Sequence, residues 1–159
     1  MLTPVNIFRA CCLRHFVSQA RVCYTRRVRE KEFIMKVHKH LPKAIYKWKI
    51  NDKYQGGVPD AFYAGPNNHC FIEYKYSDSL PAKDTSLIPV GLTEQQRLWL
   101  LKAQKNKILC YWVFGSELGV YMSQDFDKTT ITKLEYDQNN ISFKEYINEL
   151  IEICLGQVH

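Results

Sequence analysis

The sequence has no apolar run of the length that a membrane-spanning helix needs, so we expect no membrane partner. It also lacks any Cys-x-x-Cys pair, and its six cysteines are therefore not spaced as zinc ligands or as a disulfide framework. Three of the cysteines have apolar neighbours, which predicts buried free thiols in a reducing compartment: Cys70, Cys110 and Cys154.

Acidic residues are missing from positions 1–29, which hold six arginines. Because the chain has 22 basic and 16 acidic residues in all, the rest is electrically neutral. We interpret residues 1–26 as a basic, loosely ordered extension, with a phosphate-contacting arm or, over residues 1–24, a mitochondrial presequence as alternatives. The expected location is cytoplasmic, the host cytoplasm for a viral source, or mitochondrial for a presequence. Residues 27–159 are long enough for one domain with its own core.

The hydrophobic pattern alternates between helical and strand periods along this domain. Helices are predicted over residues 27–41, ending at Pro42, and after the capping boxes of Thr93 with Gln96 and Ser142 with Glu145. Strands are predicted over Ala44–Ile50, Val58–Ala64, Cys70–Tyr76, Ile108–Phe114 and Gly119–Met122, and a polar loop over residues 77–91. This order predicts an α/β fold with a mixed central sheet flanked by helices.

Two carboxylates and one ammonium fall on adjacent predicted strands. Strand alternation puts Asp60 on one face of the first strand, and Glu73 and Lys75 on one face of the second. A hard cation such as Mg²⁺ prefers oxygen ligands, which Asp60, Glu73 and the carbonyl of Tyr74 could supply. Lys75 would then lie beside a metal-bound water and the attacked phosphate. The simpler alternative is a solvent-facing cross-strand ion pair between Lys75 and one acid.

One further acid lies on the buried side of the first predicted helix. Phe33, Ile34, Val37 and Leu41 recur at helical spacing, and Glu30 precedes Ile34 by four residues on the same stripe. An acid on an inward face requires a polar partner or a function.

Over residues 27–115 the chain resembles the PD-(D/E)xK nucleases, with Pro59-Asp60 and Glu73-Tyr74-Lys75 as the signature. Within that superfamily it is most similar to small VRR-NUC and Holliday-junction-resolvase-like members common in phages. Members have a glutamate on a helix before the core strands, matched by Glu30. They also have a glutamine on a later helix, matched by Gln96, with Gln95 as second choice.

This resemblance implies a restriction-endonuclease-like core and Mg²⁺-dependent cleavage of DNA, with Mn²⁺ as a substitute, leaving a 5′-phosphate and a 3′-hydroxyl. Asp60 and Glu73 would be the metal ligands and Lys75 the positioning cation. Glu30 would assist the metal shell or orient a neighbour, and Gln96 would support the site by hydrogen bonds. Branched or otherwise structured DNA is the expected substrate. Resolving members usually work as dimers, so a homodimer is left open.

Two other functions compete with this hypothesis. A non-catalytic nucleic-acid-binding module could retain the same fold, and RNA could be the substrate of an otherwise similar enzyme. Neither alternative needs a base-reading element, and no recognition helix or finger pattern is visible.

Other polar and aromatic residues receive structural interpretations. We expect His38 and His40 to be solvated near a helix end, and Trp48, Trp99 and Trp112 to belong to the core. Tyr46 and Lys47 are weak candidates for contact with a nucleic-acid backbone.

Overall fold

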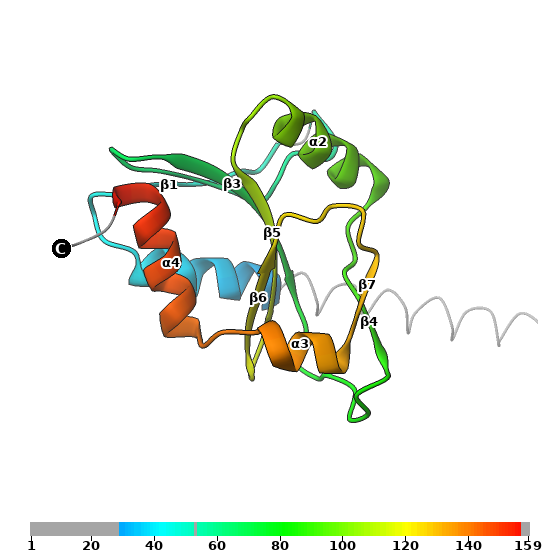
Figure 1. Ribbon diagram of the computed structural model, residues 1–159. Coiled ribbons are helices and arrows are strands. Elements are labelled where there is room, and N and C mark those ends of the chain that lie inside the picture. The colour runs from blue at the N-terminus through cyan, green and yellow to red at the C-terminus, as the bar shows by residue number, and fades with distance from the viewer. Residues whose placement is uncertain (1–28, 53, 157–159) are drawn as a thin grey trace, which may run out of the picture.

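The computed structural model describes residues 29–52 and 54–156, so the interpretation of residues 1–26 lies outside the described residues. Five strands form one sheet in the order β1-β2-β3-β5-β6 (Figure 1). They are β1 (Tyr46–Lys49), β2 (Ala61–Ala64), β3 (His69–Tyr76), β5 (Cys110–Ser116) and β6 (Gly119–Ser123).

The sheet is mixed because one neighbouring pair is parallel. β1, β2 and β3 form an antiparallel meander, β5 runs parallel to β3, and β6 returns antiparallel to β5. A parallel pair needs a crossover, which contains α2 (Glu94–Lys105). The predicted mixed α/β fold is confirmed, and the sheet strands β1, β2, β3, β5 and β6 follow the predicted order of a helix, three strands, a helix, two strands and a helix.

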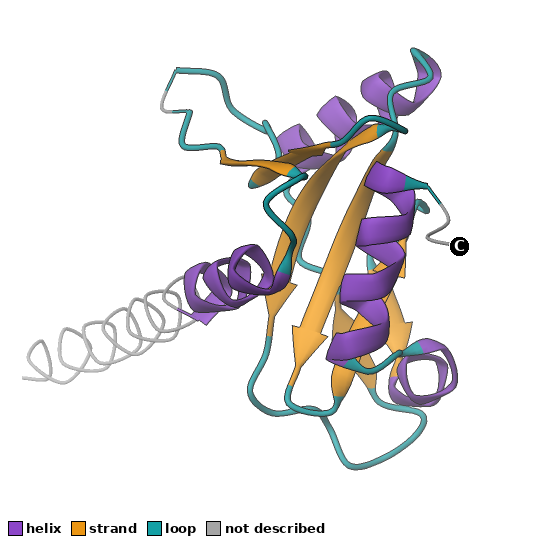
Figure 2. Cartoon of the chain, turned by 90° about the vertical axis from the view of Figure 1, so that its left-hand side faces the viewer, coloured by secondary structure: helices purple, strands orange, loops and turns teal. Residues whose placement is uncertain are grey.

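Helices cover both faces of this sheet. Residues 29–40 are helical and share one buried cluster with α4 (Phe143–Leu155), whereas α2 packs on the opposite face (Figure 2). Both predicted capping boxes are present, at Thr93 before α2 and at Ser142 before α4. Within the part of the chain that the structure describes, no helix is long and apolar enough to cross a membrane.

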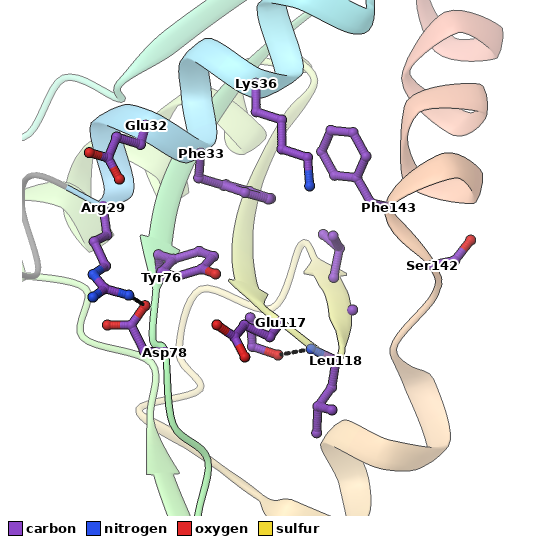
Figure 3. A pocket seen from close by; sticks show the side chains of 13 residues that line it. Arg29, Glu32, Phe33, Lys36, Tyr76, Asp78, Glu117, Leu118, Ser142 and Phe143 are labelled. Atoms are coloured by element: carbon purple, nitrogen blue, oxygen red, sulfur yellow. Dashed lines mark hydrogen bonds and ion pairs between the residues drawn. The ribbon is translucent and has the colours of Figure 1, made fainter.

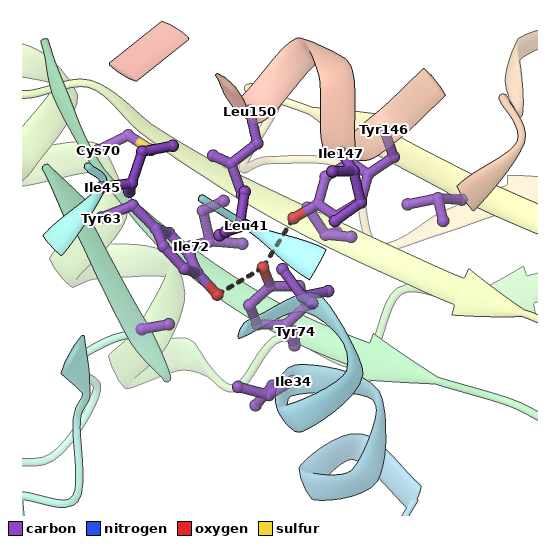
Figure 4. Close-up of a cluster of buried hydrophobic side chains, with 14 of the residues drawn as sticks. Ile34, Leu41, Ile45, Tyr63, Cys70, Ile72, Tyr74, Tyr146, Ile147 and Leu150 are labelled. Carbon is purple, nitrogen blue, oxygen red and sulfur yellow. Dashed lines mark hydrogen bonds between the residues drawn. The ribbon is translucent and has the colours of Figure 1, made fainter. Parts of the chain in front are cut away.

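The cluster below α4 contains three tyrosines that are linked through their hydroxyl groups (Figure 4). The Tyr74 hydroxyl lies 3.0 Å from that of Tyr63 and 2.7 Å from that of Tyr146. These hydrogen bonds satisfy polar atoms that would otherwise be buried without partners. The predicted buried free thiols are confirmed for Cys70, Cys110 and Cys154.

Three elements of the structure, β4 (Leu87–Pro89), β7 (Thr130–Thr132) and α3 (Lys133–Asn139), are not predicted from the sequence. β4 lies in the predicted loop 77–91 and pairs with β7, and α3 follows β7. Strands of three residues are too short to show a period, and this pair forms only because distant segments meet. β2 also begins three residues later than predicted, since Pro59 has no N–H to donate to a ladder.

Candidate metal centre

Pairing between β2 and β3 brings Asp60 opposite Glu73. Ala61 is paired with Ile72, and Asp60 directly precedes β2, so the next pair in register is Asp60 with Glu73. The Tyr74 backbone N–H donates to Oδ2 of Asp60 at 2.9 Å and fixes that carboxylate against β3. The two acids, at consecutive strands of one hairpin, therefore lie opposite each other.

Glu73 is buried, with 1% of its surface exposed. Its Oε1 accepts hydrogen bonds from Nζ of Lys75 at 2.7 Å and from Nε2 of Gln96 at 2.5 Å. Its Oε2 is also buried but has no hydrogen-bond partner among the described residues. A buried carboxylate oxygen without a donor is costly, and a cation bound there would relieve that cost.

Burial disfavours the charged form of both acids and is the main cause of the raised pKa of each. Burial first, and then the negative charge of Asp60, raise the pKa of Glu73 to about 8, with Glu30 adding to the rise. Burial also raises the pKa of Asp60, against the opposing effect of the Tyr74 N–H. Such neighbouring acids share an electrostatic penalty that a divalent cation would remove.

The first turn of α2 positions Gln96 at this site. Gln96 Oε1 accepts from the Thr93 N–H at 2.9 Å, while the Thr93 hydroxyl accepts from the Gln96 N–H. The same side-chain oxygen lies 3.5 Å from Nζ of Lys75. Gln96 thus joins the helix cap to the buried acid, and its role in a catalytic site stays a prediction.

Gln95 contacts the glycine pair instead. A Cβ added to Gly57 would lie 2.4 Å from the Gln95 backbone oxygen, and one added to Gly56 would lie 2.4 Å from its side-chain oxygen. Only glycine permits such a close approach between the loop before Asp60 and α2.

The donor set fits a metal that keeps several waters. Among residues 29–52 and 54–156, no three His, Cys, Asp or Glu side chains form a ready metal cluster. Mg²⁺ is commonly held by one or two carboxylates together with substrate phosphate, and Asp60 with Glu73 supplies that number. The carbonyl of Tyr74 stays a predicted third ligand.

The solvent-facing, cross-strand ion pair is not what the structure shows. Lys75 does pair with Glu73, but both residues lie on β3 and both are buried. A buried pair is weak support for stability, because desolvation offsets much of the attraction.

Several predictions about neighbouring side chains are wrong. Trp48 lies on the edge strand β1 and is 51% exposed, so only Trp112 is fully in the core, with Trp99 half-buried. His38 is half-buried against the ring of Tyr63, and burial lowers its pKa, so it is not solvated. His40 is exposed, as predicted.

Lys47 is occupied by a structural contact. Its ammonium donates to the backbone carbonyls of His38 and Leu41, where the first helix ends. Tyr46 is 62% exposed and stays available for contact with a ligand.

A cavity of about 540 Å³ lies between helical residues 29–40, the β5–β6 turn and the start of α4 (Figure 3). Its lining combines both signs of charge, including Arg29 paired with Asp78, and Lys36 over the ring of Phe143. None of the candidate metal-site residues lines it.

No family model matches the chain, and no curated protein matches it. Among solved structures, the chain is similar to Hjc, a Holliday junction resolvase from the archaeal hyperthermophile Archaeoglobus fulgidus. The two sequences are 12% identical, and the match covers 76% of this chain and 97% of that chain with a TM-score of 0.46.

Proposed function

We propose that this protein is a metal-dependent nuclease that hydrolyses phosphodiester bonds of DNA. The observation that carries the proposal is the buried Oε2 of Glu73, which has no hydrogen-bond partner in residues 29–52 and 54–156. Asp60 lies opposite Glu73, and Lys75 and Gln96 donate to its other oxygen. Two acids and one ammonium at a shared site supply the polar groups that metal-assisted hydrolysis requires.

Each side chain has a separate task in this proposal. Asp60 and Glu73, with the carbonyl of Tyr74, would hold the cation. A bound Mg²⁺, or Mn²⁺ in its place, lowers the pKa of a water and offsets charge on the attacked phosphate. Lys75 would position the attacking water and the phosphate, and Glu30 would adjust the negative charge near Glu73. The products would carry a 5′-phosphate and a 3′-hydroxyl.

Gln96 acts as a positioning residue. It donates to Glu73 and accepts from the Thr93 backbone, so it fixes the carboxylate relative to α2. Loss of this contact would leave Glu73 held on one oxygen by Lys75 alone.

We infer that the preferred DNA is branched or otherwise structured, read through shape and phosphate contacts rather than base sequence. A homodimer would suit a substrate with two arms. RNA cleavage is the alternative that matched RNA and DNA substrates would distinguish.

The test is incubation of the purified protein with linear, nicked, single-stranded, flapped and four-way DNAs in Mg²⁺ or Mn²⁺. Asp60→Asn and Lys75→Ala should lower the cleavage rate by at least about 100-fold, since each removes a group acting on the reacting phosphate. Glu152→Gln, an exposed change on α4, is the matched control and should cleave like the parent.

Variants that cleave as fast as the parent would overturn the proposal, provided that circular dichroism shows each variant folded. Tight, salt-dependent DNA binding without cleavage in either metal would favour the non-catalytic module instead. Against that module stands the cost of burying the acid Glu73, with the half-buried Asp60 opposite it, where the module would bind phosphate.

A further inference from the structure

Aromatic side chains form a continuous tract on the sheet face that carries Glu73. Ring centroids are 6.5 Å apart between Tyr46 and Phe62, 4.8 Å between Phe62 and Phe71, and 5.1 Å between Phe71 and Trp99. Trp48 is paired with Phe62 across the β1–β2 ladder and so projects from the same face. We name these five residues the aromatic tract.

We propose that the aromatic tract stacks unpaired bases of the DNA strand being cut, so that the substrate must be single-stranded beside the scissile phosphate. This inference rests on the proposed nuclease function and specifies its substrate.

The tract is continuous with the candidate metal centre. Phe71 precedes Glu73 by two residues on the same face of β3, and Trp99 follows Gln96 by one helical turn on α2. Successive same-face residues of a strand are about 7 Å apart, which is close to the spacing of phosphates along an extended strand. A strand whose phosphate reaches the candidate metal centre would therefore place a neighbouring base beside Phe71.

Exposure separates this tract from an ordinary core. Tyr46 and Trp48 are 62% and 51% exposed, and Phe62, Phe71 and Trp99 are half-buried. Aromatic faces bind any base by stacking, but the bases of a duplex are already stacked on one another. Only an unpaired strand presents base faces to such a surface.

The positive charge of the segments around the aromatic tract favours DNA over a second copy of this chain as the molecule that binds there. The segments that bear or border the tract, residues 43–49, 61–72 and 98–109, contain no aspartate or glutamate. They contain four exposed lysines, Lys43, Lys102, Lys105 and Lys107, whereas Lys47 and Lys49 alternate to the opposite face of β1. Two copies meeting through this face would bring like charges together, whereas a polyanion is attracted to it.

Binding is measured by fluorescence anisotropy in EDTA, with a labelled oligothymidine and a strand of equal length in which the central bases are abasic. The parent should bind oligothymidine more tightly than the abasic strand. Trp48→Ala and Tyr46→Ala should each weaken oligothymidine binding roughly 5- to 100-fold and leave abasic binding unchanged. Trp48→Phe should keep most of the affinity.

Leu118→Ala is the matched control, because Leu118 is an equally exposed apolar residue outside the tract, 65% exposed at the β5–β6 turn. It should bind both strands like the parent. Equal binding of thymidine and abasic strands, or no effect of Trp48→Ala in a folded variant, would overturn the inference. So would a dimer in sedimentation experiments that Trp48→Ala dissociates.

Failure of the two proposals can be told apart because EDTA prevents metal-dependent cleavage. If binding depends on the bases but no cleavage occurs in Mg²⁺ or Mn²⁺, only the nuclease proposal is wrong. If cleavage depends on Asp60 but binding does not depend on the bases, only the proposal for the aromatic tract is wrong.

Discussion

The ionisation of Glu73 links the candidate site to folding stability. Its pKa is raised from 4.5 to about 8, so the metal-free native state holds a proton that the unfolded chain releases. The resulting stability is fully present below the unfolded value and is lost as pH rises through about 8. We therefore expect the free energy of unfolding, measured with urea in EDTA, to fall between about pH 5 and pH 8. Glu73→Gln should show a much smaller fall.

Two comparisons test the cause of that fall. Glu152→Gln, which removes an exposed acid, should follow the parent at every pH. Mg²⁺ at pH 8 should raise the melting temperature of the parent and not that of Glu73→Gln, because metal ligands must be deprotonated. A parent whose stability is constant from pH 5 to pH 8 would show that Glu73 titrates normally.

At the residue scale, the features that could be predicted from the sequence are those that depend on local backbone geometry. A period of two placed Glu73 and Lys75 on one face, and the capping box placed Gln96 at the start of a helix. The exposure of Trp48 and the burial of His38 depend on what packs over an edge strand and a helix end. Those neighbours come from distant parts of the chain, so composition and period carry no signal for them.

At the scale of secondary-structure elements, the close contact between Gly57 and α2 leads to a prediction about stability. Gly57 has a φ of +84° and its Cβ position is blocked by the Gln95 backbone, while Gly156 has a φ of +80° and a Cβ there would make only ordinary van der Waals contact with the Asn67 side chain, at 3.5 Å. Gly156→Ala should therefore cost only the backbone strain, about 1 kcal/mol. Gly57→Ala should cost more, because backbone atoms must also move.

The consequence extends to activity, since a shift of α2 displaces Gln96 from Glu73. Gly57→Ala should lower the cleavage rate at a temperature where both variants are folded, and Gly156→Ala should not. Urea unfolding and initial cleavage rates measure the two effects separately. Equal losses in the two variants would mean that the loop yields and that the close approach does not position α2.

Element prediction succeeded where caps and periods were strong. The starts of the capped helices α2 and α4 and both ends of the strand β3 were predicted within one residue, whereas β4, β7 and α3 were missed. β4 and β7 are held by each other, with Ile88 paired to Ile131 across 43 residues. A short strand defined by a distant partner has no period of its own to detect.

Charge is divided unevenly over the whole molecule, and DNA binding should report this division. Residues 1–29 hold six arginines and no acid, while the rest is neutral. Replacing five of these arginines by glutamine should reduce the slope of log affinity against log salt by up to about 4 for duplex DNA. The replaced residues are Arg9, Arg14, Arg21, Arg26 and Arg27.

The control is a second variant, in which five positive charges are removed from the electrically neutral remainder of the chain. Five exposed lysines of that part can be changed to glutamine together: Lys31, Lys36, Lys39, Lys83 and Lys144. Because acidic residues balance the lysines in this part of the chain, we expect replacing these lysines to change the slope of log affinity against log salt less. Cleavage at low salt should persist in both variants, because Glu30, Asp60, Glu73, Lys75 and Gln96 are unchanged. An equal loss of slope in the two variants would assign phosphate contact to the folded surface, and the amino-terminal arginines would then have no special role in binding DNA.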